Sequence, residues 1–165
     1  VGALMDMFAD KLSALSRDSR ILDGEVRVRV LGRTEMLPQR VQDAIDELEG
    51  RTRGFDKANL NFCIAYGGRQ EIIDAVKKLA CKVSAGDLEV DDIDEDMLGR
   101  HLYTGGDDPD LIIRTGGDNR LSNFLLYQAA YSELFFTDVY FPAFRKMDFL
   151  RVIRSFQARA RRFGK

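Results

Sequence analysis

The sequence predicts an α/β fold with a mostly parallel central sheet and helices on both faces. Segments with strand-like patterns alternate with segments of helical periodicity, which is typical of that class. Leu111, Ile112 and Ile113 form an unbroken apolar run, as in strands covered on both faces. Two predicted strands end in paired glycines, at the position where ligands of open α/β sheets bind. At 165 residues, we expect residues 1–165 to form a single α/β domain.

The first half begins with a helical pattern over residues 2–18. Valine then alternates with arginine over residues 25–31, which indicates a strand with one solvated face. Pro38 begins a predicted helix that continues to about Arg51. One stripe of the first helix is apolar and either packs in the core or lines a lipid tunnel. Its members are Met5, Phe8, Leu12 and Leu15.

The second half continues the alternation of strands and helices. The predicted elements are a strand at 59–66, a helix from Arg69, a short helix at 93–103, a strand at 110–114, a helix at 123–132, a strand at 134–141 and a helix at 148–163. Ser122 is the expected N-cap of the helix at 123–132. The acidic run from Asp87 to Asp96 lacks the glycine and glutamate of a calcium loop, so we interpret it as a solvated loop and helix start.

Composition excludes several classes of function. The net charge of −2 does not attract polyanions, so any anion site must be local. His101 is the only histidine, which argues against a histidine triad or a His-rich zinc site. No apolar run approaches the ~20 residues that cross a bilayer. Cys63 and Cys81 lie in apolar patterns, so we expect two reduced, buried cysteines of a cytosolic protein.

The strongest candidate site surrounds the turn after residues 110–114. Arg114 ends this strand, Arg120 lies on the loop, and Ser122 is expected where the next helix would begin. A guanidinium group can bind two phosphate oxygens at once, and a helix N-terminus attracts anions. The pattern therefore predicts a phosphate or pyrophosphate site. Alternatively, the glycines are plain turns and the arginines pair with Asp107, Asp108 or Asp118. Spacing alone does not separate these interpretations.

The run from Asp110 to Glu133, DLIIRTGGDNRLSNFLLYQAAYSE, resembles the cis-prenyltransferases, which include undecaprenyl and dehydrodolichyl diphosphate synthases. Their signature reads R-T-[SG]-G-E-x-R-[LI]-S-N-F-L-L-W-Q-x-A-Y-x-E. Residues 61–72 resemble the family's N-Y-G-G-R segment, and residues 135–144 resemble its F-x-x-x-x-W-P-x-F segment. Arg162 and Gly164 match its C-terminal R-x-G. The resemblance covers essentially the whole chain.

The resemblance implies an enzyme that condenses isopentenyl diphosphate onto an allylic diphosphate with cis geometry. It implies a catalytic and substrate-binding role for Arg114, Arg120 and Ser122 as ligands of isopentenyl diphosphate. It places Glu133 in the handling of Mg²⁺. Further substrate-binding candidates are Gly117, Asn123, Arg69, Arg162 and Gly164. Arg69 is equally well interpreted as a structural arginine.

The resemblance also implies a homodimer, in which Arg162 and Gly164 reach the partner's diphosphate. No nucleic-acid partner is expected. The protein is expected to be cytoplasmic, with peripheral membrane contact through its lipid product. Aromatic residues of the segment from Gln128 to Phe144 are expected at the dimer interface because they exceed what a small domain buries.

Departures from the family pattern are conservative or peripheral, with one exception. They include Asp118 for Glu, Tyr127 and Phe141 for Trp, Ala65 for Asn, and Ala143 for Asp. The exception is the M-D-G-N-G-R-W loop of the family's first strand, which nothing here matches. The chain therefore resembles the last two-thirds of such an enzyme, and we expect these 165 residues alone to lack synthase activity.

Two other functions stay open. One is a non-catalytic accessory subunit of a heteromeric cis-prenyltransferase, although such subunits tend to lose the arginines retained here. The other is an α/β module that binds phosphate or nucleic acid without prenyl chemistry, using the arginine-rich final helix.

Overall fold

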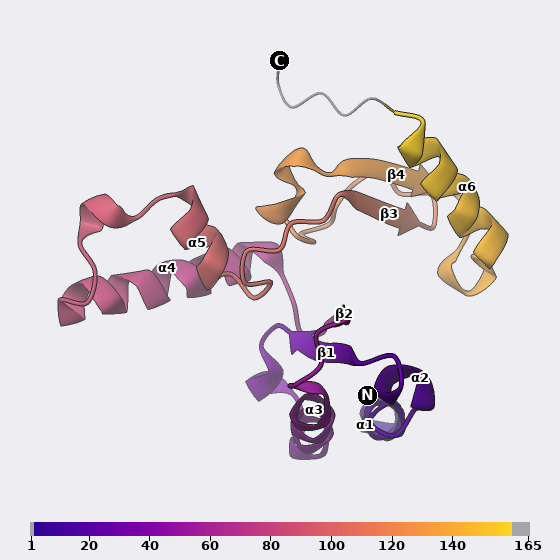
Figure 1. The fold of residues 1–165 in the computed structure, drawn as a ribbon, viewed down its shortest axis with the longest axis horizontal. Helices are drawn as coiled ribbons and strands as arrows, with labels where there is room; N and C mark the ends of the chain where they lie inside the picture. Colours follow the sequence, from indigo (N-terminus) through magenta and orange to yellow (C-terminus); the bar gives the residue numbers. More distant parts are fainter. Residues whose placement is uncertain (1, 160–165) are drawn as a thin grey trace. The chain divides into compact units, whose positions relative to one another are not determined.

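The computed structural model describes residues 2–159, which form two compact units divided after Tyr66 (Figure 1). Each unit holds helices and one pair of parallel strands, so the predicted α/β class with parallel pairing is confirmed. The prediction of a single domain over residues 1–165 stays a prediction. None of the described helices is long and apolar enough to span a membrane.

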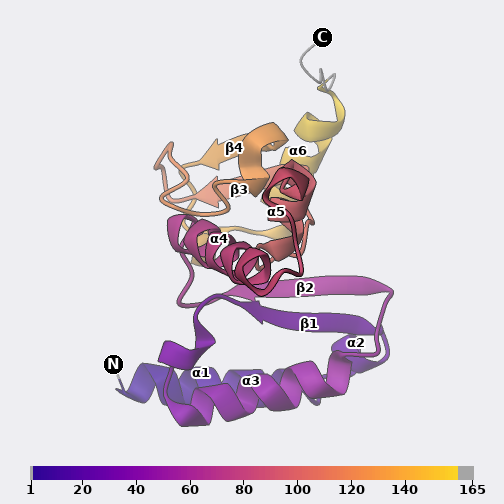
Figure 2. The ribbon, with the colours of Figure 1, turned by 90° about the vertical axis from the view of Figure 1, so that its left-hand side faces the viewer.

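The first unit contains α1 (Gly2–Leu15), α2 (Ser19–Leu22), β1 (Val26–Leu31), a 3-10 turn (Thr34–Met36), α3 (Gln39–Thr52) and β2 (Ala58–Cys63). Val26 pairs with Ala58 and Leu31 with Cys63 along the parallel strands. Helices α1 and α3 lie side by side along this strand pair (Figure 2). Because Leu12 is buried with α3 and β1 residues, and Met5, Phe8 and Leu15 pack against that cluster, the stripe of α1 belongs to the core.

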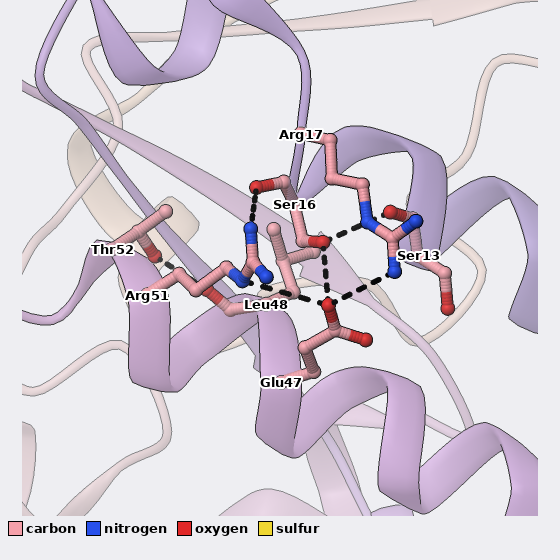
Figure 3. A network of polar contacts seen from close by, with 7 residues as sticks. All are labelled: Ser13, Ser16, Arg17, Glu47, Leu48, Arg51 and Thr52. Carbon is pink, nitrogen blue, oxygen red and sulfur yellow. Dashed lines mark hydrogen bonds and ion pairs between the residues drawn. The ribbon is translucent and has the colours of Figure 1, made fainter.

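A polar network joins α1 to α3 beside this core (Figure 3). The Ser16 hydroxyl, which is fully buried, lies 2.9 Å from the Ser13 carbonyl oxygen and 3.1 Å from Glu47 Oε1, so these two acceptors share its single hydrogen. Glu47 also pairs with Arg17 and Arg51, at 3.7 and 3.5 Å. A buried hydroxyl costs free energy unless it is hydrogen-bonded, so this network fixes the register between the helices.

Side chains of α3 also close the outer edge of β1. Thr52 Oγ1 accepts the Val28 N–H at 3.1 Å and donates to the Leu48 carbonyl at 3.0 Å. Glu49 Oε1 accepts the Val30 N–H at 2.6 Å. Buried backbone groups need partners, and α3 supplies them on the edge of β1 where, within the described part of the chain, no strand pairs with it.

The second unit contains α4 (Gly68–Ala85), α5 (Glu95–His101), β3 (Leu111–Thr115), β4 (Glu133–Thr137) and α6 (Lys146–Gln157), with 3-10 turns at Val90–Asp92, Gln128–Tyr131 and Phe141–Ala143. Leu111 pairs with Glu133 and Thr115 with Thr137 in the parallel pair. Gly86 ends α4 with a φ of 78°. Asp94 begins α5, where its Oδ1 accepts the Met97 N–H at 2.7 Å, which confirms the expected acidic helix start.

The helix predicted at 123–132 is wrong. Ser122, Asn123 and Leu125 adopt φ values of 48°, 65° and 45°, which no right-handed helix accommodates. Only the 3-10 turn Gln128–Tyr131 forms in this segment. Ser122 therefore does not begin a helix in this segment.

Three smaller predictions also need correction. The strand expected at 134–141 ends at Thr137. Cys81 is exposed and Cys63 half-buried, so neither belongs to the buried core. The helical periodicity after Arg69 predicts Ile73, Val76 and Leu79 on the inward face of α4, but only Leu79 of these is buried, and Ile73 and Val76 are about half exposed.

Candidate active site

The candidate site forms where β3 turns at Gly116 and Gly117. Both glycines have positive φ, 94° and 82°, and their N–H groups donate to the carbonyls of Val139 and Thr137, each at 3.0 Å. These bonds attach the turn to the segment that ends β4. The Gly117 N–H is therefore engaged within the protein, and the residue's predicted contact with substrate stays a prediction.

Arg114 is the central side chain of this site. Its Nη1 donates to Ser122 Oγ at 2.7 Å and to the Arg120 carbonyl, and its Nη2 donates to Asp118 Oδ2 at 3.0 Å. One guanidinium therefore holds both ends of the loop that follows β3. The structure brings Arg114, Arg120 and Ser122 together, as the sequence predicts, although Ser122 takes part as an acceptor and not as a helix cap.

Asp118 links the two arginines. Its Oδ2 also accepts from Arg120 Nη2 at 2.8 Å, so one carboxylate oxygen serves both guanidinium groups. The alternative interpretation, in which the arginines pair with a neighbouring aspartate, is therefore confirmed for Asp118 as a matter of geometry. Because the Arg120 side chain is 67% exposed and Asp118 47%, this pairing is weak and can exchange for another anion.

Asn123 lies at the start of α4. Its carbonyl accepts the Gly68 N–H at 2.7 Å, and its Oδ1 accepts the Arg69 N–H at 2.9 Å. Asn123 thus caps α4 through Arg69, which lies 54 residues earlier in the sequence. No local sequence pattern predicts this role, because the partners are distant along the chain.

Arg69 stands at the rim of a cavity of about 240 Å³ that Asn123 and Leu126 complete. Its side chain is exposed, and no ion pair holds it among residues 2–159. A guanidinium beside a capped helix N-terminus is suited to an anion. The substrate-binding role of Arg69 stays a prediction beside its structural alternative.

Glu133 begins β4, whereas Arg114 lies near the end of β3. Since Glu133 is in register with Leu111, it sits three residues from the level of Arg114, or ~10 Å along the strands. Its carboxylate pairs with Arg159 at 2.7 Å. Within the described part of the chain, no group of three His, Cys, Asp or Glu side chains could hold a metal ion. The described residues therefore form no three-ligand metal cage, and Glu133 offers a single carboxylate. Arg162 and Gly164 lie outside the described residues.

Comparison with known proteins identifies the family. Residues 1–164 match the family described as "Putative undecaprenyl diphosphate synthase". The chain belongs to this family. The resemblance to cis-prenyltransferases is thereby confirmed.

Individual relatives are consistent with this family. The chain is 55% identical to the tritrans,polycis-undecaprenyl-diphosphate synthase (geranylgeranyl-diphosphate specific) of Pyrococcus horikoshii, covering all of this chain and 63% of that protein. The chain thus spans less than two-thirds of that relative's length. Among solved structures, lavandulyl diphosphate synthase from Lavandula x intermedia, in complex with dimethylallyl diphosphate, has a TM-score of 0.91 and 36% identity over 98% of this chain and 70% of that one. A probable undecaprenyl diphosphate synthase from Campylobacter jejuni has a TM-score of 0.80 and 35% identity, covering 99% of this chain and 72% of that one.

Proposed function

We propose that this chain belongs to a prenyl transferase that adds isopentenyl diphosphate to an allylic diphosphate and so extends a cis-polyprenyl chain. The observation that carries the proposal is the cluster of Arg114, Arg120 and Ser122 after β3, in a chain of this family. Two guanidinium groups and a hydroxyl match the oxygens of a diphosphate.

The proposed chemistry uses these groups for binding and charge stabilisation. As the new C–C bond forms, the allylic C–O bond breaks, pyrophosphate leaves the allylic substrate and the isopentenyl unit loses a proton. Cationic groups beside the allylic diphosphate stabilise the charge on the departing pyrophosphate, whereas the diphosphate of the isopentenyl unit stays attached. Arg114 and Arg120 hold the diphosphate of isopentenyl diphosphate once it replaces the Asp118 carboxylate. Arg69 and its cavity supply a second place for phosphate oxygens.

We also propose that the reaction requires Mg²⁺. This cation is bound by one or two carboxylates together with substrate phosphates, so Glu133 can contribute one ligand once Arg159 releases it. If the proposal is right, chelation with EDTA abolishes turnover by the full-length protein and added Mg²⁺ restores it. Turnover that persists in EDTA removes Glu133 from metal binding.

The direct test replaces the arginines in the full-length protein. Arg114→Ala and Arg120→Ala should each raise the KM for isopentenyl diphosphate and lower kcat, since one charge-assisted bond is worth about 1.5–3 kcal/mol, or roughly ten- to over a hundredfold. Arg114→Ala should cost more, because Arg114 also holds Ser122 and the Arg120 carbonyl.

Radiolabelled isopentenyl diphosphate with geranylgeranyl, farnesyl or dimethylallyl diphosphate as primer gives the kinetics. Arg53→Ala, which removes an exposed arginine at the end of α3, is the matched control and should behave as wild type. Kinetics within twofold of wild type for both site variants would exclude the cluster. A wild-type protein that binds isopentenyl diphosphate but turns over only with a second, different subunit would support the accessory-subunit alternative.

We also propose a cytoplasmic homodimer that meets the membrane through its lipid product. Exposed aromatic side chains support the dimer: Tyr131, Tyr140 and Phe141 are each more than 70% exposed. Apolar surface of this kind usually marks a partner interface. Analytical ultracentrifugation of the full-length protein at micromolar concentration should show a dimer. A fully active monomer would overturn this part of the proposal.

A further inference from the structure

A buried carboxylate joins α4 to the loop of residues 116–131. Glu71 Oε1 accepts from Gln128 Nε2 at 3.0 Å and from the Tyr103 N–H at 2.8 Å. Glu71 is 0% exposed and Gln128 is 1% exposed. A buried carboxylate is costly unless it is hydrogen-bonded, and its bonds are strong because they carry charge. This contact therefore constrains the loop more than a surface bond would.

Glu71 sets the orientation of the Gln128 side-chain amide. Gln128 Nε2 points to Glu71 and, at 3.3 Å, to Thr104 Oγ1. Gln128 Oε1 is buried and has no hydrogen-bond partner among residues 2–159. Turning the amide over would place its carbonyl against the carboxylate, so the side chain accepts an unpartnered oxygen to keep its donor on Glu71.

The same face of α4 carries the other contacts with this loop. Gly68 lies one turn before Glu71, and a Cβ added at Gly68 would meet Leu126 Cγ at 2.9 Å and the Asn123 carbonyl oxygen at 3.2 Å. Residues 123–128 of the loop therefore pack against the first turns of α4. Arg120 and Ser122 immediately precede this packed segment, and Arg69 lies on the part of α4 that the segment contacts.

We propose that Glu71 and Gln128 are positioning residues that hold Arg120, Ser122 and Arg69 in one arrangement for a diphosphate. The inference rests on the proposed function, because it takes the arginine cluster to be a diphosphate site. Neither side chain can touch substrate, since both are buried. Their effect is exerted through the loop.

The test exchanges the two chemical groups in the full-length protein. Gln128→Glu places a second carboxylate beside that of Glu71, where the loop packs on α4. The double variant Glu71→Gln with Gln128→Glu restores one amide and one carboxylate with their places exchanged, and Thr104 can then donate its hydroxyl to the new carboxylate. Gln70→Glu makes the same chemical change one residue before Glu71, beside Asp74 on α4, and is the matched control.

Two readouts are compared, after circular dichroism shows that each variant is folded at the assay temperature. Calorimetry gives the Kd for inorganic pyrophosphate, and steady-state kinetics give KM for each substrate separately. Gln128→Glu should weaken pyrophosphate binding and raise the KM for isopentenyl diphosphate at least tenfold, while the allylic KM changes less than threefold. The double variant should return within threefold of wild type, and Gln70→Glu should stay within twofold.

Three results would overturn the inference. These are values within twofold of wild type for a folded Gln128→Glu, a loss confined to kcat with both KM values unchanged, and a double variant that regains thermal stability without regaining affinity. A wild type that binds pyrophosphate without transferring prenyl groups refutes the proposed function, while the pyrophosphate comparison still decides the role of Glu71. A wild type that binds no pyrophosphate overturns both.

Discussion

The chain contains two Gly-Gly turns after strands, and they use glycine for different reasons. Tyr66-Gly67-Gly68-Arg69 leads directly into the 18-residue helix α4. Arg114-Thr115-Gly116-Gly117 leads into an irregular loop. In sequence the two motifs look like the same device for bringing backbone close to a ligand.

At the first turn, the glycines allow the protein's own chain to come close. A Cβ at Gly67 would lie 2.7 Å from Asn123 Nδ2, and one at Gly68 would lie 3.1 Å from the Leu126 backbone nitrogen. Gly67 has an ordinary extended backbone, with φ at −159°. Space, not conformation, requires glycine here.

At the second turn, conformation requires glycine. Gly116 and Gly117 have positive φ, while the nearest atoms to an added Cβ are side-chain atoms at 3.8 and 3.4 Å, which is ordinary contact. A glycine pair in a sequence therefore indicates a close turn. It does not show whether glycine is required there by a ligand, by a neighbouring loop or by the backbone angle.

The largest expected effect is at Gly68. Gly68→Ala forces α4 and the 116–131 loop apart, because two of the three nearest atoms are backbone. We expect a loss of about 1–3 kcal/mol in the free energy of unfolding, the usual cost of overpacking, together with a raised KM for isopentenyl diphosphate. Urea denaturation and kinetics measure the two. Wild-type values for both would show that the loop is not seated on α4.

Gly117→Ala should cost about 1–2 kcal/mol for a different reason, the left-handed backbone. Gly117→Asn should cost less than Gly117→Ala, because asparagine tolerates this conformation. At Gly68 the order reverses, since the larger side chain needs more space. Thermal denaturation of the alanine and asparagine variants at Gly68 and Gly117 tests this difference directly. The same order of stability at both positions would contradict it.

Removing the side chain that caps α4 should have a smaller effect. Asn123→Gly keeps the left-handed backbone but loses the acceptor for the Arg69 N–H, at a cost of about 1 kcal/mol. Asn123→Asp retains an oxygen there and should lie within about 0.5 kcal/mol of wild type. Equal losses for both in urea denaturation would count against the cap.

The smallest expected effect has the opposite sign. Gly50 lies inside α3, and nothing approaches within 4 Å of an added Cβ. Gly50→Ala should raise the free energy of unfolding by about 0.5–1 kcal/mol, because alanine loses less entropy in a helix. A lower melting temperature for this variant would show that the space around Gly50 is smaller than the structure indicates.

Most of the fold could be predicted because periodicity is local. Helix α3 and strands β1 and β3 begin and end within one residue of where the sequence patterns place them, and α4 begins one residue before the predicted Arg69. The helix expected at 123–132 failed because the deciding bonds are not local. Asn123 caps a helix 54 residues away, and this contact holds a backbone that local propensity would not select.

The residues of the candidate site also differ in whether local sequence predicts them. Arg114, Arg120 and Ser122 could be predicted as a group because they lie within nine residues and the β3 turn brings them together. The burial of Glu71 could not be predicted, because acidic residues at helix starts are common and mostly exposed. Its partners, Tyr103 and Gln128, come from two other segments of the chain.

The outer edge of β1 has a consequence for solubility. An uncovered strand edge offers unpaired N–H groups on which a second molecule can add a strand, the first step of aggregation. At Val28 and Val30 these donors are already taken by Thr52 and Glu49 of α3. A strand from another molecule would have to displace both side chains and leave a hydroxyl and a carboxylate without those bonds. Helix α3 thus protects the valine-rich strand from self-association on this side.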